Sequence, residues 1–393
     1  MPFKVCTFLA SKHMNKIFAL CLTAAMVVAC RPEPIDPVGQ YLNLPETAFT
    51  YTPDDLPAHF MQANVLTADN TPLNNPVTDD GATLGRVLFY DRNLSANHST
   101  SCASCHHQDR GFGDSARFSV GFEGGRTTRH SMGLSNARFY SSGAFFWDER
   151  ATSLEDQVLM PIQDAIEMGL SIDTMLARIN AAPYYPLLFD NAFGSAEVTE
   201  LRVRQALAQF VRSMMSYGSS YDEGRAQVAT PVQPFPNFTA QENQGKALFF
   251  GVAPGGGPAA PGACVNCHGT EAFTAPGPRN NGLDATTTDA GVGGVNGNAA
   301  QVGLFKVPSL RNLSDRGPFM HDGRFASLEQ VIDHYSTGVQ NHPNLSPQLR
   351  GPNGQPILPN FTAAQKASLV AFLRTLDDPG FATDLRFSDP FIR

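Results

Sequence analysis

The stretch "CASCH" (102–106) decides the fold of this chain, and it returns as "CVNCH" at 264–268. Two cysteines that are separated by two residues and followed by histidine could be half of a zinc site, a redox dithiol or the attachment point of a c-type haem. The two cysteine pairs are 159 residues apart, whereas the halves of a zinc site usually lie about 15–20 residues apart. A thioredoxin-type dithiol needs a βαβ context, and no helix–strand alternation flanks either motif.

The histidine after each pair is the feature that zinc and dithiol chemistry do not require. In a c-type haem, two thioethers fix the macrocycle, and the adjacent imidazole reaches the iron as proximal ligand. We therefore predict two covalently bound haem c groups, with His106 and His268 as proximal iron ligands. The attachment residues would be Cys102, Cys105, Cys264 and Cys267.

The other three of the seven cysteines lie within residues 1–30. That segment has a basic start, the apolar run "IFALCLTAAMVVA" and then Cys30, a pattern typical of a secretory signal. The ending "VVAC" resembles a bacterial lipobox, in which the cysteine is lipidated; an ordinary cleaved signal with an incidental Cys30 is the alternative. We expect a periplasmic protein, anchored to the membrane only through a lipid.

Composition sets broad limits on the remaining chain. Of the 393 residues, 42% are hydrophobic and 16% are charged, as in a globular protein with a sizeable core. The formal charge is −8, and removing the signal with its three lysines and no acids changes it to −11. Because nucleic-acid affinity depends on neutralising phosphates with basic residues, we expect no nucleic-acid partner.

Two further pairs of segments indicate an internal duplication. "LGRVLFY" (84–90) precedes the first haem motif, and "QGKALFF" (244–250) precedes the second. After each motif, "WDERATSLEDQVLMP" (147–161) matches "HDGRFASLEQVIDHY" (321–335) at five positions without gaps. A recurrent helix-start pattern is the alternative, but the same order around both haem motifs favours duplication.

Helical signals dominate the sequence, and no convincing run of alternating strands occurs. Capping-box spacing predicts helix starts at Thr152 with Glu155, Ser327 with Gln330, Thr239 with Glu242, and Thr362 with Gln365, and Thr199 opens a further helix. The first buried stripe is expected to hold Leu201, Leu207, Phe210, Val211 and Met214, and the last Leu369, Phe372, Leu373 and Leu376. The predicted fold class is all-α, with two cytochrome-c-like haem domains related by duplication and joined by long irregular loops.

The domain boundaries follow from these signals and from composition. We expect a signal over 1–30, a proline-rich lead over 31–77, an N-terminal haem domain over 78–225, a linker over 226–240, a C-terminal haem domain over 241–385 and a tail over 386–393.

The duplicated segments differ at one chemically decisive position. Pro161 ends the first copy, and Tyr335 ends the second. If this position lies over the distal face of each haem, Tyr335 can coordinate ferric iron through its phenolate oxygen, whereas proline has no donor. One iron would then be capped and the other open to peroxide. The alternative is a packed tyrosine with His334 or Met320 as the sixth ligand.

With these motifs, residues 78–385 resemble the bacterial di-haem cytochrome c peroxidases and the related MauG proteins. "KVPSLRN" (306–312) and "PFMHDG" (318–323) match the C-terminal signature of that family. The resemblance implies a peroxidatic N-terminal haem and an electron-relaying C-terminal haem. The axial position 14 residues after His321 is methionine in the ordinary peroxidases and tyrosine in MauG, so Tyr335 makes this chain MauG-like there.

Within "FFWDERATSLEDQVLMPIQDAIEMG" (145–169), the same resemblance implies three catalytic residues. Trp147 would carry electrons between the haems, Gln157 would face the distal side one turn before Pro161, and Glu167 would act as acid–base. Peroxide cleavage needs a proton to be taken up and returned, and the apolar context of Glu167 should raise its pKa. The alternatives are a packed tryptophan, a surface amide and a salt-bridged glutamate.

Two departures from the family pattern alter what is expected. "FSVGFEGG" (118–125) lacks the displaceable histidine of the ordinary peroxidases, so reductive activation should be unnecessary unless His130 substitutes for it. The family's inter-domain calcium ligand in "RN" is replaced by Arg129–His130. Imidazole suits a hard oxygen-seeking cation poorly, which makes calcium doubtful.

We therefore predict a periplasmic di-haem peroxidase that reduces hydrogen peroxide with electrons from a small cytochrome c or cupredoxin. Two alternatives are an oxidase that, like MauG, modifies a protein substrate by long-range electron removal, and a di-haem electron carrier without peroxidase activity. Reactivity toward peroxide separates the carrier from the two enzymes.

Overall fold

A computed structural model describes residues 36–53, 56–252, 262–314 and 316–393. The predicted signal and Cys30 lie outside these residues. Residues 37–393 form one unit by their mutual contacts. Across the described residues, no helix is long and apolar enough to cross a membrane.

The predicted all-α class is confirmed, since the described chain forms helices, loops and isolated β-bridges without a named strand. The α-helices are α1 (Ala63–Leu66), α2 (Asp79–Tyr90), α3 (Leu154–Gln157), α4 (Met160–Gln163), α5 (Ile172–Ala181), α6 (Tyr185–Phe193), α7 (Glu200–Ser213), α8 (Ser220–Arg225), α9 (Ala240–Phe250), α10 (Val292–Asn296), α11 (Leu328–Asp333), α12 (Ala363–Arg374) and α13 (Pro379–Thr383). The shorter 3₁₀ turns are η1 (Arg92–Leu94), η2 (Cys102–Ser104), η3 (Gln108–Arg110), η4 (Ala137–Phe139), η5 (Cys264–Asn266), η6 (Ala299–Gln301), η8 (Pro347–Leu349) and η9 (Leu385–Phe387), and η7 (His334–Gly338) is a π-helical turn.

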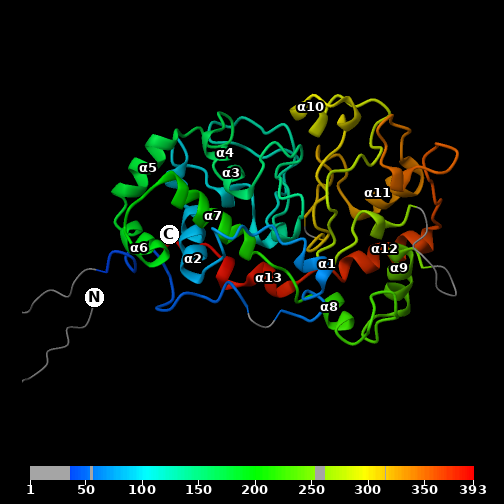
Figure 1. Ribbon diagram of the computed structural model, residues 1–393, viewed down its shortest axis with the longest axis horizontal. Helices are drawn as coiled ribbons and strands as arrows, with labels where there is room; N and C mark the ends of the chain where they lie inside the picture. Colours follow the sequence, from blue (N-terminus) through cyan, green and yellow to red (C-terminus); the bar gives the residue numbers. More distant parts are fainter. Residues whose placement is uncertain (1–35, 54–55, 253–261, 315) are drawn as a thin grey trace, which may run out of the picture. The chain divides into compact units, whose positions relative to one another are not determined.

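In the N-terminal half, helix α2 crosses helix α7 at very short range (Figure 1). Gly85 permits this approach, because a Cβ atom at that position would lie 2.0 Å from the carbonyl oxygen of Ala206. One turn further along α2, the ring of Phe89 packs edge-on against that of Phe210, with centroids 5.3 Å apart. The glycine therefore brings two buried aromatic faces together just before the first haem motif.

The C-terminal half repeats this crossing with helices α9 and α12 (Figure 1). A Cβ atom on Gly245 would lie 1.8 Å from the carbonyl oxygen of Ser368. Phe249 then contacts Phe372, with ring centroids 5.1 Å apart. Because Gly245 and Phe249 are the residues that the sequence match pairs with Gly85 and Phe89, the predicted duplication extends to tertiary packing.

Most predicted helix starts are confirmed, and one is wrong by a residue. Ser153, not Thr152, is the N-cap of α3, and its hydroxyl accepts from the backbone amide of Asp156 at 3.1 Å. Glu155, expected to complete the cap, instead forms a two-pronged ion pair with Arg212 (2.5 and 2.9 Å). Charge pairing with a buried guanidinium outcompetes a local cap because it satisfies both groups.

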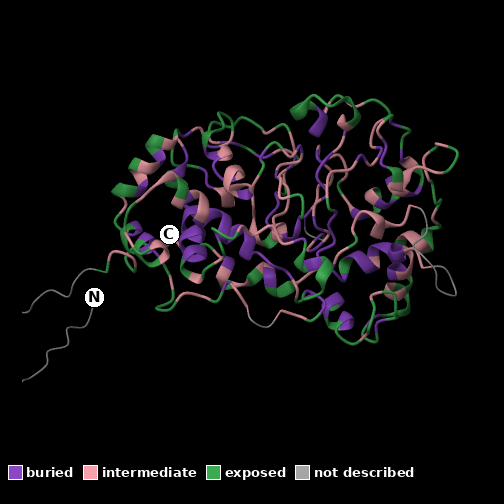
Figure 2. Cartoon of the chain, in the orientation of Figure 1, coloured by how far each residue is buried: buried purple, intermediate pink, exposed green. Residues whose placement is uncertain are grey.

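The predicted buried stripes are nearly complete. Side chains of α7 and α12 contribute to the two halves of the core, and Figure 2 colours the buried residues of the chain purple. Leu201 is the exception, since its side chain is 61% exposed at the first turn of α7. The proline-rich stretch 229–238 also contributes to the core, because Phe235 and Phe238 are buried there.

Candidate functional site

The first cysteine motif lies on the 3₁₀ turn η2 and ends at His106. The Nδ1 group of His106 donates to the carbonyl oxygen of Phe112 at 2.7 Å. Phe112 turns that carbonyl inward through a left-handed backbone conformation (φ 59°) and is fully buried. With Nδ1 bound to the backbone, Nε2 is the nitrogen available to a metal, which is the arrangement that orients ligating histidines.

The second motif repeats this geometry on η5. The Nδ1 group of His268 donates to the carbonyl oxygen of Phe273 at 2.9 Å, and Phe273 has a φ of 53°. Both histidines are therefore held in one tautomer by an aromatic residue in a left-handed turn. Such outliers cluster at functional positions.

The state of the four motif cysteines argues against the other two interpretations of the spacing. None of them forms a disulfide. Burial raises the pKa of Cys102 to about 12 and that of Cys264 to about 12, whereas redox-active cysteines rely on a stabilised thiolate. Across the described residues, no group of three or more His, Cys, Asp or Glu side chains could hold a metal ion.

A cavity opens over the first motif and collects every residue that the sequence assigned to the peroxidatic site. Its walls include Cys102, Cys105, His106, Trp147, Gln157, Pro161 and Glu167. Gln157 ends α3, and Pro161 lies in the first turn of α4, so the two short helices present both residues to the same cavity. Pro161 offers no donor atom to this space.

Glu167 has the electrostatic environment that the sequence predicted. Desolvation by burial and the negative charge of Asp164 raise the pKa of Glu167 to about 7, against a smaller opposing effect of Arg150. Arg150, whose charge opposes the rise in the pKa of Glu167, is paired with Asp148 at 3.0 Å, and the described residues contain no ion pair of Glu167 that would support the salt-bridged alternative. A carboxyl group poised near neutrality can both accept and donate a proton.

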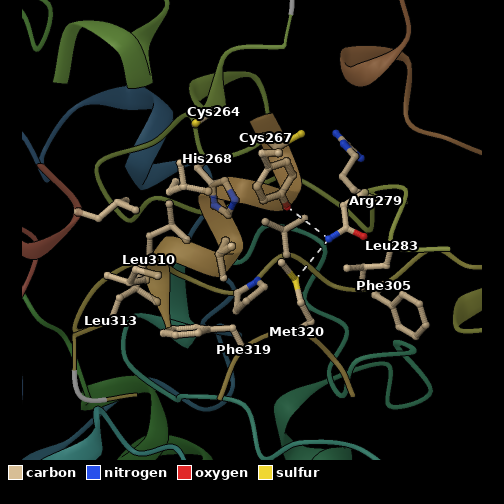
Figure 3. Close-up of a pocket in the computed structure, with 18 of the residues that line it drawn as sticks. Cys264, Cys267, His268, Arg279, Leu283, Phe305, Leu310, Leu313, Phe319 and Met320 are labelled. Carbon is tan, nitrogen blue, oxygen red and sulfur yellow. Dashed lines mark hydrogen bonds between the residues drawn. The ribbon is translucent and has the colours of Figure 1, made fainter. Parts of the chain in front are cut away.

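The second cavity surrounds His268 and contains Tyr335 (Figure 3). Helix α11 leads into the π-helical turn η7, which brings the half-buried Tyr335 into this space. The side-chain amide of Asn281 donates to the Tyr335 hydroxyl at 3.3 Å and contacts the Met320 sulfur at 3.4 Å (Figure 3). The cavity that His268 lines therefore also holds an oxygen and a sulfur donor.

His334, the other alternative ligand, is directed elsewhere. Its Nε2 group bonds to the carbonyl oxygen of Asn281 at 3.0 Å, and its side chain does not line the cavity. Of the donors considered from sequence, Tyr335 and Met320 remain in position.

Trp147 lines both cavities, so it lies where the predicted electron link between them would have to lie. Its indole Nε1 donates to the carbonyl oxygen of His130 at 2.8 Å. Its own carbonyl accepts from the backbone amide of Lys306 at 2.8 Å, and Lys306 also lines both cavities. His130 bonds through Nδ1 to the carbonyl oxygen of Ala116 at 3.2 Å.

The calcium expectation concerns Arg129, next to His130. Its guanidinium pairs with Asp148 at 2.5 Å and with Asp289 at 2.8 Å. A positive side chain between two carboxylates disfavours a cation at the same place.

Both cavities fit a haem by their donor sets, each with two cysteines and a backbone-oriented histidine. In the second cavity, the buried Nε of Arg279 has no hydrogen-bond partner among the described residues. A haem carries carboxylates that such a guanidinium can pair with. Sequence reasoning assigned no role to Asn281, Arg279 or Lys306, although Lys306 opens the segment "KVPSLRN" (306–312). The loops of Asn281 and Arg279 carry no periodic signal, and the burial of Lys306 cannot be read from spacing.

One helical chain thus carries two haem-attachment motifs, and each motif lines its own cavity. This combination defines a di-haem oxidoreductase of the c type. Residues 79–228 match the family model described as di-haem cytochrome c peroxidase. The methylamine utilization protein MauG of Methylorubrum extorquens is 37% identical over 308 residues, which cover 78% of this chain and 80% of that protein. The chain belongs to the di-haem cytochrome c peroxidase family.

Relatives of two kinds are found within this family. MauG of Methylophilus methylotrophus is 31% identical over 85% of this chain and 90% of its own, and the cytochrome c551 peroxidase of Nitrosomonas europaea is 30% identical over 83% and 90%. The crystal structure of a MauG-like protein associated with microbial copper homeostasis superimposes with a TM-score of 0.69 at 31% identity, covering 82% of this chain and 96% of that one. Because both MauG proteins and cytochrome c peroxidases are among the relatives, the role of this chain within the family has to be inferred from its site residues.

Proposed function

We propose that this protein reduces hydrogen peroxide to water at the N-terminal cavity and draws the electrons through the C-terminal one. The main observation behind this proposal is that the two cavities differ in their possible iron ligands. The first contains Pro161, which has no donor atom, and the second contains Tyr335, which has a phenol oxygen. When bound, haem supplies the one-electron redox chemistry and an iron position for peroxide. The N-terminal cavity, where Pro161 offers no iron ligand, would then have room for peroxide.

The residues of the N-terminal cavity have the properties that peroxide cleavage needs. Reduction of H2O2 consumes two protons and two electrons and yields two water molecules. Glu167 as carboxylate can take a proton from one peroxide oxygen and return it to the other, which then leaves as water. Gln157 faces the same space and can hold peroxide by a hydrogen bond from its amide.

The C-terminal cavity is suited to relaying electrons. Tyr335 would occupy the sixth iron position there and exclude substrate. Trp147 spans the two cavities and shortens the path for an electron between them. A small cytochrome c or cupredoxin is the donor that fits a relay of this kind.

A second candidate is an oxidase that removes electrons from a protein substrate, as in a MauG-type reaction. The tyrosine at 335 and the 37% identity to a MauG protein favour it. Both candidates begin with peroxide at the N-terminal cavity and differ in where the electrons originate.

Turnover of peroxide by the purified holoprotein tests the choice. Steady oxidation of a reduced cytochrome c or cupredoxin supports the peroxidase, whereas covalent change in a candidate partner protein without cytochrome oxidation supports the oxidase. Two six-coordinate haems that do not react with peroxide would leave only the electron carrier.

We further propose a periplasmic location with a lipid on Cys30. A Cys30→Ala variant should then move from the membrane fraction to the soluble periplasmic fraction. If the protein with an intact Cys30 fractionates as soluble, the lipid anchor is wrong.

A further inference from the structure

We propose that Tyr140 is a redox-active tyrosine that delivers an electron to the haem centres when peroxide oxidises them, with Glu149 as the acceptor of its proton. This inference rests on the proposed reaction with peroxide. Besides Trp147, Tyr140 would then be a second side chain that can supply an electron to the oxidised haem centres.

The phenol is buried, and the carboxylate that it bonds to is half-buried. Tyr140 is 1% exposed, and its hydroxyl donates a hydrogen bond to Glu149 Oε1. The exposed Ser142 hydroxyl donates to the same oxygen at 3.1 Å. Glu149 Oε1 therefore accepts both from the buried phenol and from a hydroxyl at the surface.

The ring of Tyr140 lies one side chain away from both haem cavities. The Nζ atom of Lys306 is 3.6 Å from the centroid of the Tyr140 ring, and Lys306 lines both cavities. The Lys306 amide is also bonded to the carbonyl oxygen of Trp147 at 2.8 Å, so the proposed donor is packed against the residue next to Trp147 in the hydrogen-bond network.

The backbone at Glu149 gives an independent reason to assign it a role. Glu149 adopts a left-handed conformation with a φ of 54°, and the residue that matches it in the second copy is Gly323, with a φ of 61°. Glycine suits that conformation, whereas a longer side chain is strained there. The first copy therefore tolerates strain at the position that provides the carboxylate.

The chemical step is balanced by proton transfer along the existing hydrogen bond. Tyr140 loses one electron to the peroxide-oxidised haem centre, its O–H bond breaks, and an O–H bond forms on Glu149. The products are a neutral tyrosyl radical and a protonated Glu149, and a one-electron donor later restores both. Burial and the negative Glu149 raise the pKa of Tyr140 far above its usual range, so oxidation has to be coupled to the loss of the proton.

The test is freeze-quenched EPR of the holoprotein after addition of peroxide, in the absence of a donor. A tyrosyl radical is expected in the wild type and should be lost in Tyr140→Phe, which keeps the ring and its packing. Glu149→Gln should lower the radical yield about tenfold, the size expected from loss of a hydrogen bond to a charged group. A matched control is Tyr185→Phe, because Tyr185 is also buried and donates to a carboxylate (Asp91, 2.8 Å). The rings that the Lys306 ammonium lies over are those of Tyr140 and Phe145, so Tyr185 lacks the contact that connects Tyr140 to the cavities.

The outcomes separate this inference from the proposed function. Loss of the radical in Tyr140→Phe with an intact peroxide-induced change in haem absorption supports the assignment. If peroxide changes the haem spectra and the radical persists in Tyr140→Phe or disappears equally in Tyr185→Phe, Tyr140 is not the donor. If peroxide leaves the haem spectra of the wild type unchanged, the peroxide reaction fails and this inference fails with it.

Discussion

The indole nitrogen of Trp147 donates to the carbonyl oxygen of His130 at 2.8 Å, and this bond fixes the ring in the wall that two cavities share. The neighbouring residue Asp148 is held by Arg129 at 2.5 Å. The chain's single tryptophan therefore has one defined orientation between the predicted haem sites.

Trp147→Phe keeps an aromatic ring but removes the indole and its hydrogen bond. We expect peroxide-driven oxidation of an external donor to slow by about tenfold or more, equivalent to about 1.4 kcal/mol in the barrier, while haem content stays the same. Stopped-flow spectroscopy of donor oxidation measures this effect. Phe146→Leu is the control, because Phe146 lines the N-terminal cavity and not the C-terminal one. An equal decrease in the rate of donor oxidation in both variants would contradict an electron-relay role for Trp147.

Glu167→Gln should lower the rate of the reaction with peroxide by about 10²–10⁴, the usual size of a general acid–base contribution. Its raised pKa of about 7 sets the pH dependence. Proton uptake from peroxide needs the carboxylate, so the rate should rise as pH increases through about 7 and be low below it.

The contribution of Asp164 to that profile can be tested separately. Its negative charge raises the pKa of Glu167, so Asp164→Asn should move the midpoint of the pH–rate profile to lower pH. The midpoint is read from rates of haem spectral change at varied pH. A pH-independent rate in the wild type would contradict the acid–base role of Glu167.

Tyr335→Phe removes the phenol oxygen and leaves the ring in the C-terminal cavity. EPR and resonance Raman spectra of the ferric protein should show one high-spin and one low-spin haem, and only the low-spin signal should change in this variant. Met320→Leu distinguishes the other donor in the cavity. If the low-spin signal survives Tyr335→Phe and is lost in Met320→Leu, methionine is the ligand.

Gly85→Ala should destabilise the N-terminal half, because the added Cβ would meet the Ala206 carbonyl at 2.0 Å. Overpacking of this kind costs about 1–3 kcal/mol, which denaturant unfolding of the holoprotein can resolve. Gly277→Ala is the control, since its Cβ would find its nearest neighbour at 3.9 Å. Equal stability of the two variants would show that the close helix crossing is not required.

Part of the site could be predicted from sequence because its chemistry is local. The haem motifs need cysteine and histidine within five residues, and the caps at Thr199, Thr239 and Thr362 need partners only three residues away. The cap at Thr152 was wrong because its partner Glu155 is taken by Arg212, which is 57 residues distant.

The helical class, the duplication and the candidate residues around each predicted haem can be inferred from the amino-acid sequence, since these follow from spacing and from matching segments. The folded chain was needed to reveal that Trp147 and Lys306 line both cavities, that Asn281 bonds to Tyr335, and that Tyr140 lies against Lys306. These relationships join loops that are far apart in the chain. Burial and long-range packing select them, and neither leaves a periodic trace in the sequence.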